Sequence, residues 1–136
     1  MSKLLVIDDC EIQHFIIDKM LGREEIFEER EASFDAELAI NQLENDRLDE
    51  DKLPDVIFLD LVMPGFTGFD FLERFKNLQR SIQKNIHVFI LTCSLNPADK
   101  KNSEQYPFVK GFIVKPVSMH TLKNIALAYS GSMELL

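Results

Sequence analysis

Short apolar runs typical of β-strands alternate along this chain with longer segments of helical periodicity. Five such runs are each followed by a helix-like segment, and the connections between them are short. Strict alternation of this kind favours parallel strands joined by crossover helices. The sequence therefore predicts an α/β fold: a doubly wound, five-stranded parallel sheet with five helices.

The predicted strands differ in how far we expect them to be buried. Residues 56–59 are apolar at every position, as in a central strand covered on both faces. Residues 26–31 are charged, which predicts an edge strand. The remaining strands are predicted at residues 4–7, 87–91 and 112–114. Residues 45–52 are uniformly polar and are interpreted as a solvated loop.

Each predicted helix carries apolar residues expected to face the sheet. Helix starts are predicted at Ser33, Thr67, Asn96 and Ser118, which can cap a helix N-terminus. Thr67 and Asp70 have the spacing of a capping pair. The expected inward residues are Ile12, Phe15, Ile16 and Met20, then Phe34, Leu38, Ala39 and Leu43, then Phe71, Leu72, Phe75 and Leu78, and finally Leu122, Ile125, Ala126 and Tyr129.

Composition excludes several classes of function. The 136 residues suit one domain, and 23 acidic against 15 basic side chains give a net charge of −8. That balance argues against nucleic acid or an anionic membrane as the main partner. No apolar run approaches the ~20 residues of a membrane span, and no secretion signal is recognisable. The two cysteines cannot form a disulfide framework, so we expect a reducing, cytoplasmic location.

Polar residues stand directly after four of the apolar runs. They are Asp8 and Asp9, then Asp60, then Thr92, then Lys115. In open α/β sheets, ligands bind beyond the carboxyl ends of the strands. Each such residue alone would be an ordinary turn or cap residue. Together they predict a single site with three carboxylates, a hydroxyl and an ammonium group.

This set of groups favours phosphoryl chemistry. Neighbouring carboxylates repel one another, and a hard divalent cation such as Mg²⁺ relieves the repulsion. Magnesium, an ammonium group and a hydroxyl together can hold the oxygens of a phosphoryl group. A carboxylate with a pKa of ~3.9 is ionised at neutral pH, so one aspartate could act as a nucleophile and form an aspartyl-phosphate.

The sequence resembles the receiver domain of two-component response regulators, of the CheY-like type, over about residues 3–129. The resemblance is carried by Val6-Ile7-Asp8-Asp9, by LDLVMPGFTGFDFL over residues 59–72, by Leu91-Thr92 and by Lys115-Pro116. It implies a flavodoxin-like fold with strand order 2-1-3-4-5. It also implies a signalling domain rather than an enzyme, catalysing only its own phosphorylation and dephosphorylation.

The resemblance also implies roles for individual residues. Asp60 would be the phosphoacceptor, and Thr92 and Lys115 would contact the phosphoryl group. Phe112 occupies the position of the family's switch aromatic residue, with Thr92 as its partner in the switch. The Lys115–Pro116 peptide bond would be cis. The expected magnesium ligands are Asp8, Asp9, Asp60 and the backbone carbonyl of Val62.

Some residues depart from common receiver patterns or carry no assigned role. Val62 is apolar where many receivers are polar, and Phe112 lacks the hydroxyl of the tyrosine often found there. His14 is interpreted as a surface residue. In the receiver strand order, Cys10 and Cys93 would lie about 10 Å apart, too far for a disulfide.

The partners follow from the resemblance. The phosphoryl donor would be a sensor histidine kinase or a histidine phosphotransfer protein, and the output would be an unidentified protein. Residues 1–129 are assigned to the receiver domain, and residues 130–136 to a short tail with no output domain. Two alternatives remain open. One is a phosphohydrolase of the haloacid dehalogenase type, although Val62 stands where its second aspartate belongs. The other is a receiver-like module that is never phosphorylated.

Overall fold

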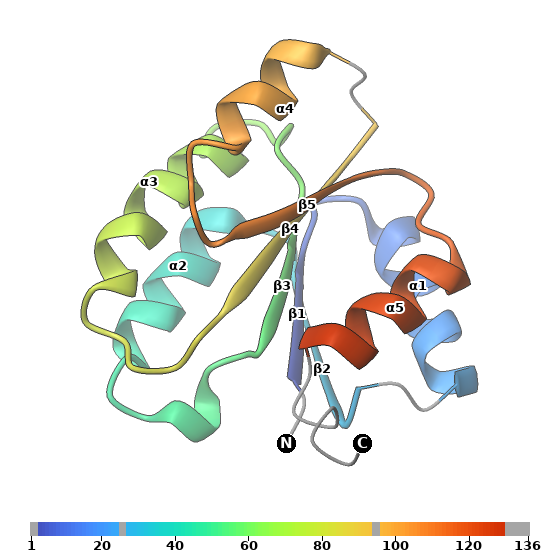
Figure 1. Cartoon of the computed structure of the whole chain (residues 1–136), viewed down its shortest axis with the longest axis horizontal. Coiled ribbons are helices and arrows are strands. Elements are labelled where there is room, and N and C mark those ends of the chain that lie inside the picture. Colours follow the sequence, from blue (N-terminus) through green and yellow to red (C-terminus); the bar gives the residue numbers. More distant parts are fainter. Residues whose placement is uncertain (1–2, 25–26, 94–95, 130–136) are drawn as a thin grey trace.

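The structure is a computed structural model that describes residues 3–24, 27–93 and 96–129. Its five strands all pair in parallel, in the order β2-β1-β3-β4-β5 (Figure 1). The predicted sheet is therefore confirmed. The strands are β1 (Lys3–Ile7), β2 (Glu29–Ser33), β3 (Val56–Leu59), β4 (His87–Thr92) and β5 (Val109–Val114).

Five α-helices cover the sheet. Helices α1 and α5 lie on one face, and α2, α3 and α4 lie on the other (Figure 1). A 3-10 turn, Glu50–Lys52, lies in the segment predicted as a loop. The helices are α1 (Glu11–Glu24), α2 (Ala36–Asn45), α3 (Gly68–Gln79), α4 (Pro97–Ser103) and α5 (Met119–Tyr129).

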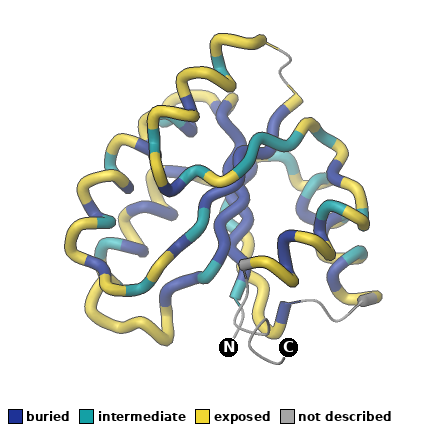
Figure 2. The backbone as a smooth tube through the Cα atoms, viewed as in Figure 1, coloured by how far each residue is buried: buried dark blue, intermediate teal, exposed yellow. Residues whose placement is uncertain are grey.

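The sheet separates two hydrophobic cores, and buried residues concentrate along the strands (Figure 2). One core contains Phe71 and Phe75 of α3, and the other contains Leu122 and Ile125 of α5. All four residues of β3 are fully buried, as the apolar run predicts. Most of β2 is exposed, as predicted for a charged edge strand.

The predicted boundaries of β2 and α2 were wrong. Strand β2 begins at Glu29 and ends at Ser33, because its whole length pairs with β1 from Lys3 to Ile7. Ser33 is therefore a strand residue and not a helix cap. The side chain of Asp35 caps α2 instead, accepting hydrogen bonds from two backbone N–H groups. Strand β5 likewise begins three residues earlier than predicted.

The predicted inward faces of α1 and α2 were partly wrong. Ile12 and Phe15 are 67% and 62% exposed, whereas Ile17 and Leu21 of the same helix are buried. For α2, Phe34 lies outside the helix, and both Phe34 and Leu38 are exposed. The predicted inward residues of α3 are all buried, and so are Leu122, Ile125 and Ala126 of α5.

Several local predictions are confirmed. Thr67 and Asp70 form a reciprocal capping box at the start of α3. Asn96 caps α4, whose first residue is Pro97. Cys10 and Cys93 are both free thiols.

No helix within the described ranges has the length and apolar character needed to cross a membrane. Ile26 and the predicted tail, residues 130–136, lie outside the described residues.

Candidate functional site

Three aspartates meet where β1 and β3 end. Ile7 pairs with Leu59, so Asp8 and Asp60 continue two adjacent strands. The backbone N–H of Asp60 donates to the carbonyl of Ile7 at 2.9 Å. One carboxylate oxygen each from Asp8, Asp9 and Asp60 lies within 4.8 Å of the others. Asp8 and Asp60 are buried whereas Asp9 is exposed, so the cluster is open to solvent on one side.

Lys115 brings a positive charge to this cluster from the end of β5. Its Nζ lies 2.6 Å from Asp8 Oδ2 and 3.3 Å from Asp60 Oδ2, and its side chain is only 6% exposed. Its backbone N–H donates to the carbonyl of Thr92 at 2.8 Å, which ties it to the end of β4. The Lys115–Pro116 peptide bond is cis, as predicted.

Burial and contact with a group of opposite charge shift the pKa values of Asp60 and Lys115 in opposite directions. Burial raises the pKa of Asp60, and the Asp8 charge adds to this, although the Val62 N–H and Lys115 partly offset the effect. Burial alone would lower the pKa of Lys115, but its contacts with Asp8 and Asp60 outweigh burial and raise it. The site therefore combines a strongly held cation with a carboxylate whose negative charge is incompletely neutralised.

The loop after β3 holds Asp60 in place. The backbone N–H of Val62 donates to Asp60 Oδ1 at 3.1 Å, while the Val62 side chain is 66% exposed. Gly68 packs so closely against this loop that a Cβ there would lie 2.5 Å from the Asp60 carbonyl oxygen. Gly65 has a φ of 77°, a conformation that favours glycine.

Thr92 and Phe112 lie on neighbouring strands and face the same side of the sheet. Phe112 pairs with Ile90, and Thr92 is two residues beyond Ile90 on β4. Side chains two residues apart on a strand point to the same face. Thr92 is buried, whereas Phe112 is only half-buried and packs against the core that α2 and α3 cover. The structure thus places all the predicted site residues at one end of the sheet.

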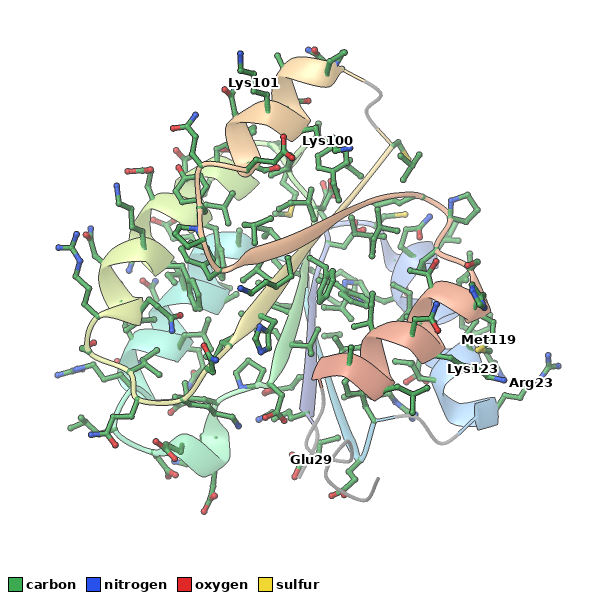
Figure 3. The ribbon with its side chains drawn as sticks, viewed as in Figure 1. Arg23, Glu29, Lys100, Lys101, Met119 and Lys123 are labelled. Carbon is green, nitrogen blue, oxygen red and sulfur yellow. The ribbon has the colours of Figure 1, made fainter. Side chains whose placement is uncertain are left out.

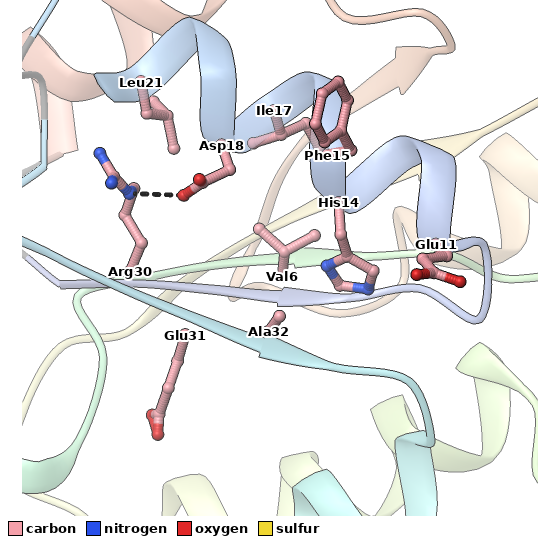
Figure 4. A pocket seen from close by; sticks show the side chains of 10 residues that line it. All are labelled: Val6, Glu11, His14, Phe15, Ile17, Asp18, Leu21, Arg30, Glu31 and Ala32. Atoms are coloured by element: carbon pink, nitrogen blue, oxygen red, sulfur yellow. Dashed lines mark ion pairs between the residues drawn. The ribbon is translucent and has the colours of Figure 1, made fainter. Parts of the chain in front are cut away.

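His14 is buried, so the prediction of a surface position was wrong. The His14 ring is buried under α1 and lies among the residues that line a cavity of about 310 Å³ (Figure 4). Its Nε2 lies 2.7 Å from the backbone carbonyl oxygen of Asp8. No motif signals this contact, because a single histidine within an apolar helical segment is equally compatible with a surface position.

The sequence model of the response regulator receiver domain matches residues 4–127. The chain belongs to this family. A receiver domain is a signalling domain rather than a classical enzyme, so the phosphohydrolase alternative is set aside. Receiver domains bind Mg²⁺ at an acidic pocket, and the Asp8, Asp9 and Asp60 cluster fits that pattern.

Similar proteins agree with this assignment. The receiver domain is 25% identical to a two-component response regulator from Cytophaga hutchinsonii, with a TM-score of 0.77 over 93% of this chain and 97% of that one. It is 25% identical to chemotaxis protein CheY4 of Vibrio cholerae, with a TM-score of 0.70 over 91% and 94% of the two chains. It is also 26% identical over 132 residues, 93% of this chain, to the sensory/regulatory protein RpfC of Xanthomonas campestris, but spans only 17% of that protein.

Proposed function

We propose that this receiver domain accepts a phosphoryl group on Asp60 in a two-component phosphorelay and passes the signal on through protein contacts. The observation that carries the proposal is the arrangement of Asp60 itself. Its carboxylate is buried beside Asp8 and Asp9 and faces the ammonium group of Lys115. Three carboxylates and one cation at the carboxyl ends of parallel strands suit the binding of a metal ion and a phosphoryl group.

The proposed magnesium ligands are Asp8, Asp9, Asp60 and the carbonyl of Val62. The chemistry of these donors fits the ion, since Mg²⁺ prefers oxygen ligands and retains several waters. The exposure of Asp9 leaves room for those waters. When bound, the ion would offset the carboxylate charges and hold one phosphoryl oxygen.

The proposed transfer needs no general base. A carboxylate oxygen of Asp60 attacks phosphorus, an O–P bond forms, and the bond from phosphorus to the donor breaks. With a phosphohistidine donor the imidazole leaves with the bonding electron pair. Lys115 neutralises charge on the phosphoryl oxygens, and the Thr92 hydroxyl donates to one of them. Phe112 then responds to the new position of Thr92.

The proposed phosphoryl donor is a sensor histidine kinase or a histidine phosphotransfer protein. The similarity to RpfC, a sensory/regulatory protein, supports a donor of this class. The surface near the site also supports contact with a protein, because Ile12, Phe15 and Phe34 are exposed large apolar side chains. Phe34 additionally lines a groove that reaches Asp9.

The proposed output surface is formed by α4, β5 and α5. Lys100 and Lys101 project from α4, and Lys123 from α5 (Figure 3). Val114 and Leu127 are exposed apolar residues on β5 and α5. A surface that combines apolar and cationic groups suits a protein partner rather than a small ligand. We propose that this signalling takes place in the cytoplasm.

Beryllofluoride, which mimics a phosphoryl group on aspartate, tests the proposal. With magnesium present, we expect amide resonance shifts at Asp9, Asp60 and Thr92, extending to β5. The Asp60→Asn variant is the matched control and should not show the beryllofluoride-dependent shifts. Absence of shifts in the wild type, or equal shifts in the variant, would contradict a role for Asp60 as acceptor.

A further inference from the structure

His14 contacts one member of the aspartate cluster, although it is not one of the residues at the strand ends. It lies at the end of the first turn of α1, and its ring points from the helix toward the strands (Figure 4). Nε2 is 2.7 Å from the backbone carbonyl oxygen of Asp8. A carbonyl oxygen can only accept a hydrogen bond, so Nε2 carries the hydrogen and donates. Both residues are buried, which protects this bond from competition by water.

This bond completes the support of the Asp8 backbone. The N–H of Asp8 donates to the carbonyl of Ser33 on β2 at 3.0 Å, and its carbonyl accepts from His14. The Asp8 side chain is held as well, because its Oδ1 accepts from the N–H of Cys10 at 2.9 Å and its Oδ2 pairs with Lys115. Asp8 is therefore fixed from β2, α1 and β5 together.

The His14 ring is itself held in place. Phe34 packs against it, with 4.3 Å between ring centroids and an interplanar angle of 44°. The backbone N–H of His14 donates to the carbonyl of Cys10 at 3.4 Å, which joins α1 to the turn that follows Asp9. His14 thus connects the first turns of α1 to the backbone of a proposed metal ligand.

We propose that His14 is a positioning residue for the magnesium site, acting through the carbonyl of Asp8. Without the ion, three carboxylates within 4.8 Å repel one another, and a free Asp8–Asp9 turn would relax outward. The His14 bond opposes that movement, so the ligands are already in place when the ion arrives. Groups that hold metal ligands by hydrogen bonds raise metal affinity in this way. The inference rests on the proposed binding of magnesium at this cluster.

Three variants separate positioning from simple packing. His14→Phe keeps a ring against Phe34 but removes the N–H donor. His14→Gln retains a donor at a similar reach. Ile17→Val is the control, because Ile17 is buried on the same helix and its aliphatic side chain cannot donate a hydrogen bond to Asp8. Magnesium titration followed by amide resonances gives the Kd of each, and thermal unfolding gives the stability of each.

We expect His14→Phe to raise the magnesium Kd about tenfold, the lower range for loss of a ligand-orienting bond. His14→Gln should recover most of the affinity, and Ile17→Val should bind as the wild type does. In the metal-free protein, the carbonyl ¹³C resonance of Asp8 should move in His14→Phe and not in Ile17→Val.

Wild-type affinity in His14→Phe, an equal loss in Ile17→Val, or no recovery in His14→Gln would overturn the positioning role while leaving the proposed function intact. If the wild type itself shows no saturable shifts at Asp9 and Asp60, the proposed magnesium site fails, and this inference fails with it.

Discussion

Asp60 is buried between a neighbouring carboxylate and a neighbouring ammonium group, and this environment makes its charge costly. Its pKa is raised above the ordinary value of 3.8, mainly by burial. The folded state therefore binds the Asp60 proton more tightly than the unfolded state does. Ionised Asp60 consequently lowers the free energy of unfolding, and the loss develops as pH rises through the raised pKa.

The first prediction follows from the destabilising effect of ionised Asp60. Without divalent cations at neutral pH, Asp60→Asn should unfold at a higher urea concentration than the wild type, because the amide carries no buried charge. The difference should shrink as pH falls toward 3.8 and vanish well below that value, where Asp60 is protonated in both the folded and the unfolded state. Urea denaturation from neutral pH to below pH 3.8 measures it. A less stable variant at neutral pH would show that the Lys115 contact outweighs burial.

The second prediction concerns the two glycines after Asp60. Gly68→Ala should lower the free energy of unfolding by about 2 kcal/mol or more. The added methyl group would clash with the Asp60 carbonyl oxygen, so the loop must shift. Gly65→Ala meets no atom within 4 Å and should cost about 1 kcal/mol through its positive φ alone. Urea denaturation compares the two, and equal losses would mean that the close approach at Gly68 is easily relieved.

The sequence was sufficient to predict the position of a site residue wherever the strand topology alone determines that position. Asp8, Asp60, Thr92 and Lys115 each end a recognisable strand, and parallel strands bring those ends together. His14 could not be predicted in this way. Its bond to Asp8 depends on the rotation of α1 about its axis, which the local sequence leaves open.

At the scale of elements, α1 shows why some helix faces were predicted wrongly. It carries apolar residues on overlapping stripes, so periodicity alone cannot select the buried one. The tertiary structure buries Ile17 and Leu21 and leaves Ile12 and Phe15 exposed. Helix α3 has one clear apolar stripe, and its buried face was predicted correctly. The bounds of β2 are likewise determined by its pairing with β1, because its own sequence has only a weak strand pattern.

This difference gives the third prediction. Phe75→Ala on α3 should cost about 3–5 kcal/mol of stability, because it leaves a cavity in a packed core. Phe15→Ala on α1, a matched change at a 62% exposed position, should change stability by no more than about 0.5 kcal/mol. Thermal or urea unfolding of both variants measures this. A large loss of stability in Phe15→Ala would mean that the Phe15 ring makes a contact that this structure does not show.

In the whole molecule, the proposed signal must travel from Asp60 to the surface formed by α4, β5 and α5. The sheet offers a short route, because Thr92 and Phe112 face the same side of neighbouring strands. Phe112 is half-buried, so we propose that its ring can occupy a more exposed and a more buried position. A ligand acts on such a pair of states by shifting their populations.

The fourth prediction is that beryllofluoride with magnesium moves the Phe112 ring inward. Ring proton resonances and their contacts should change in the wild type, and the change should be lost or reduced in Thr92→Ala. The physical reason is that a Thr92 hydroxyl drawn toward the acceptor leaves space beside Phe112. Identical ring environments in the free and activated wild type would rule out this switch.

Phosphoryl transfer to Asp60 can be measured by intact-protein mass spectrometry after incubation with acetyl phosphate and Mg²⁺. We expect a mass gain of one phosphoryl group in the wild type, and no gain in Asp60→Asn or when magnesium is chelated. An unmodified wild type, or the same gain in Asp60→Asn, would contradict it.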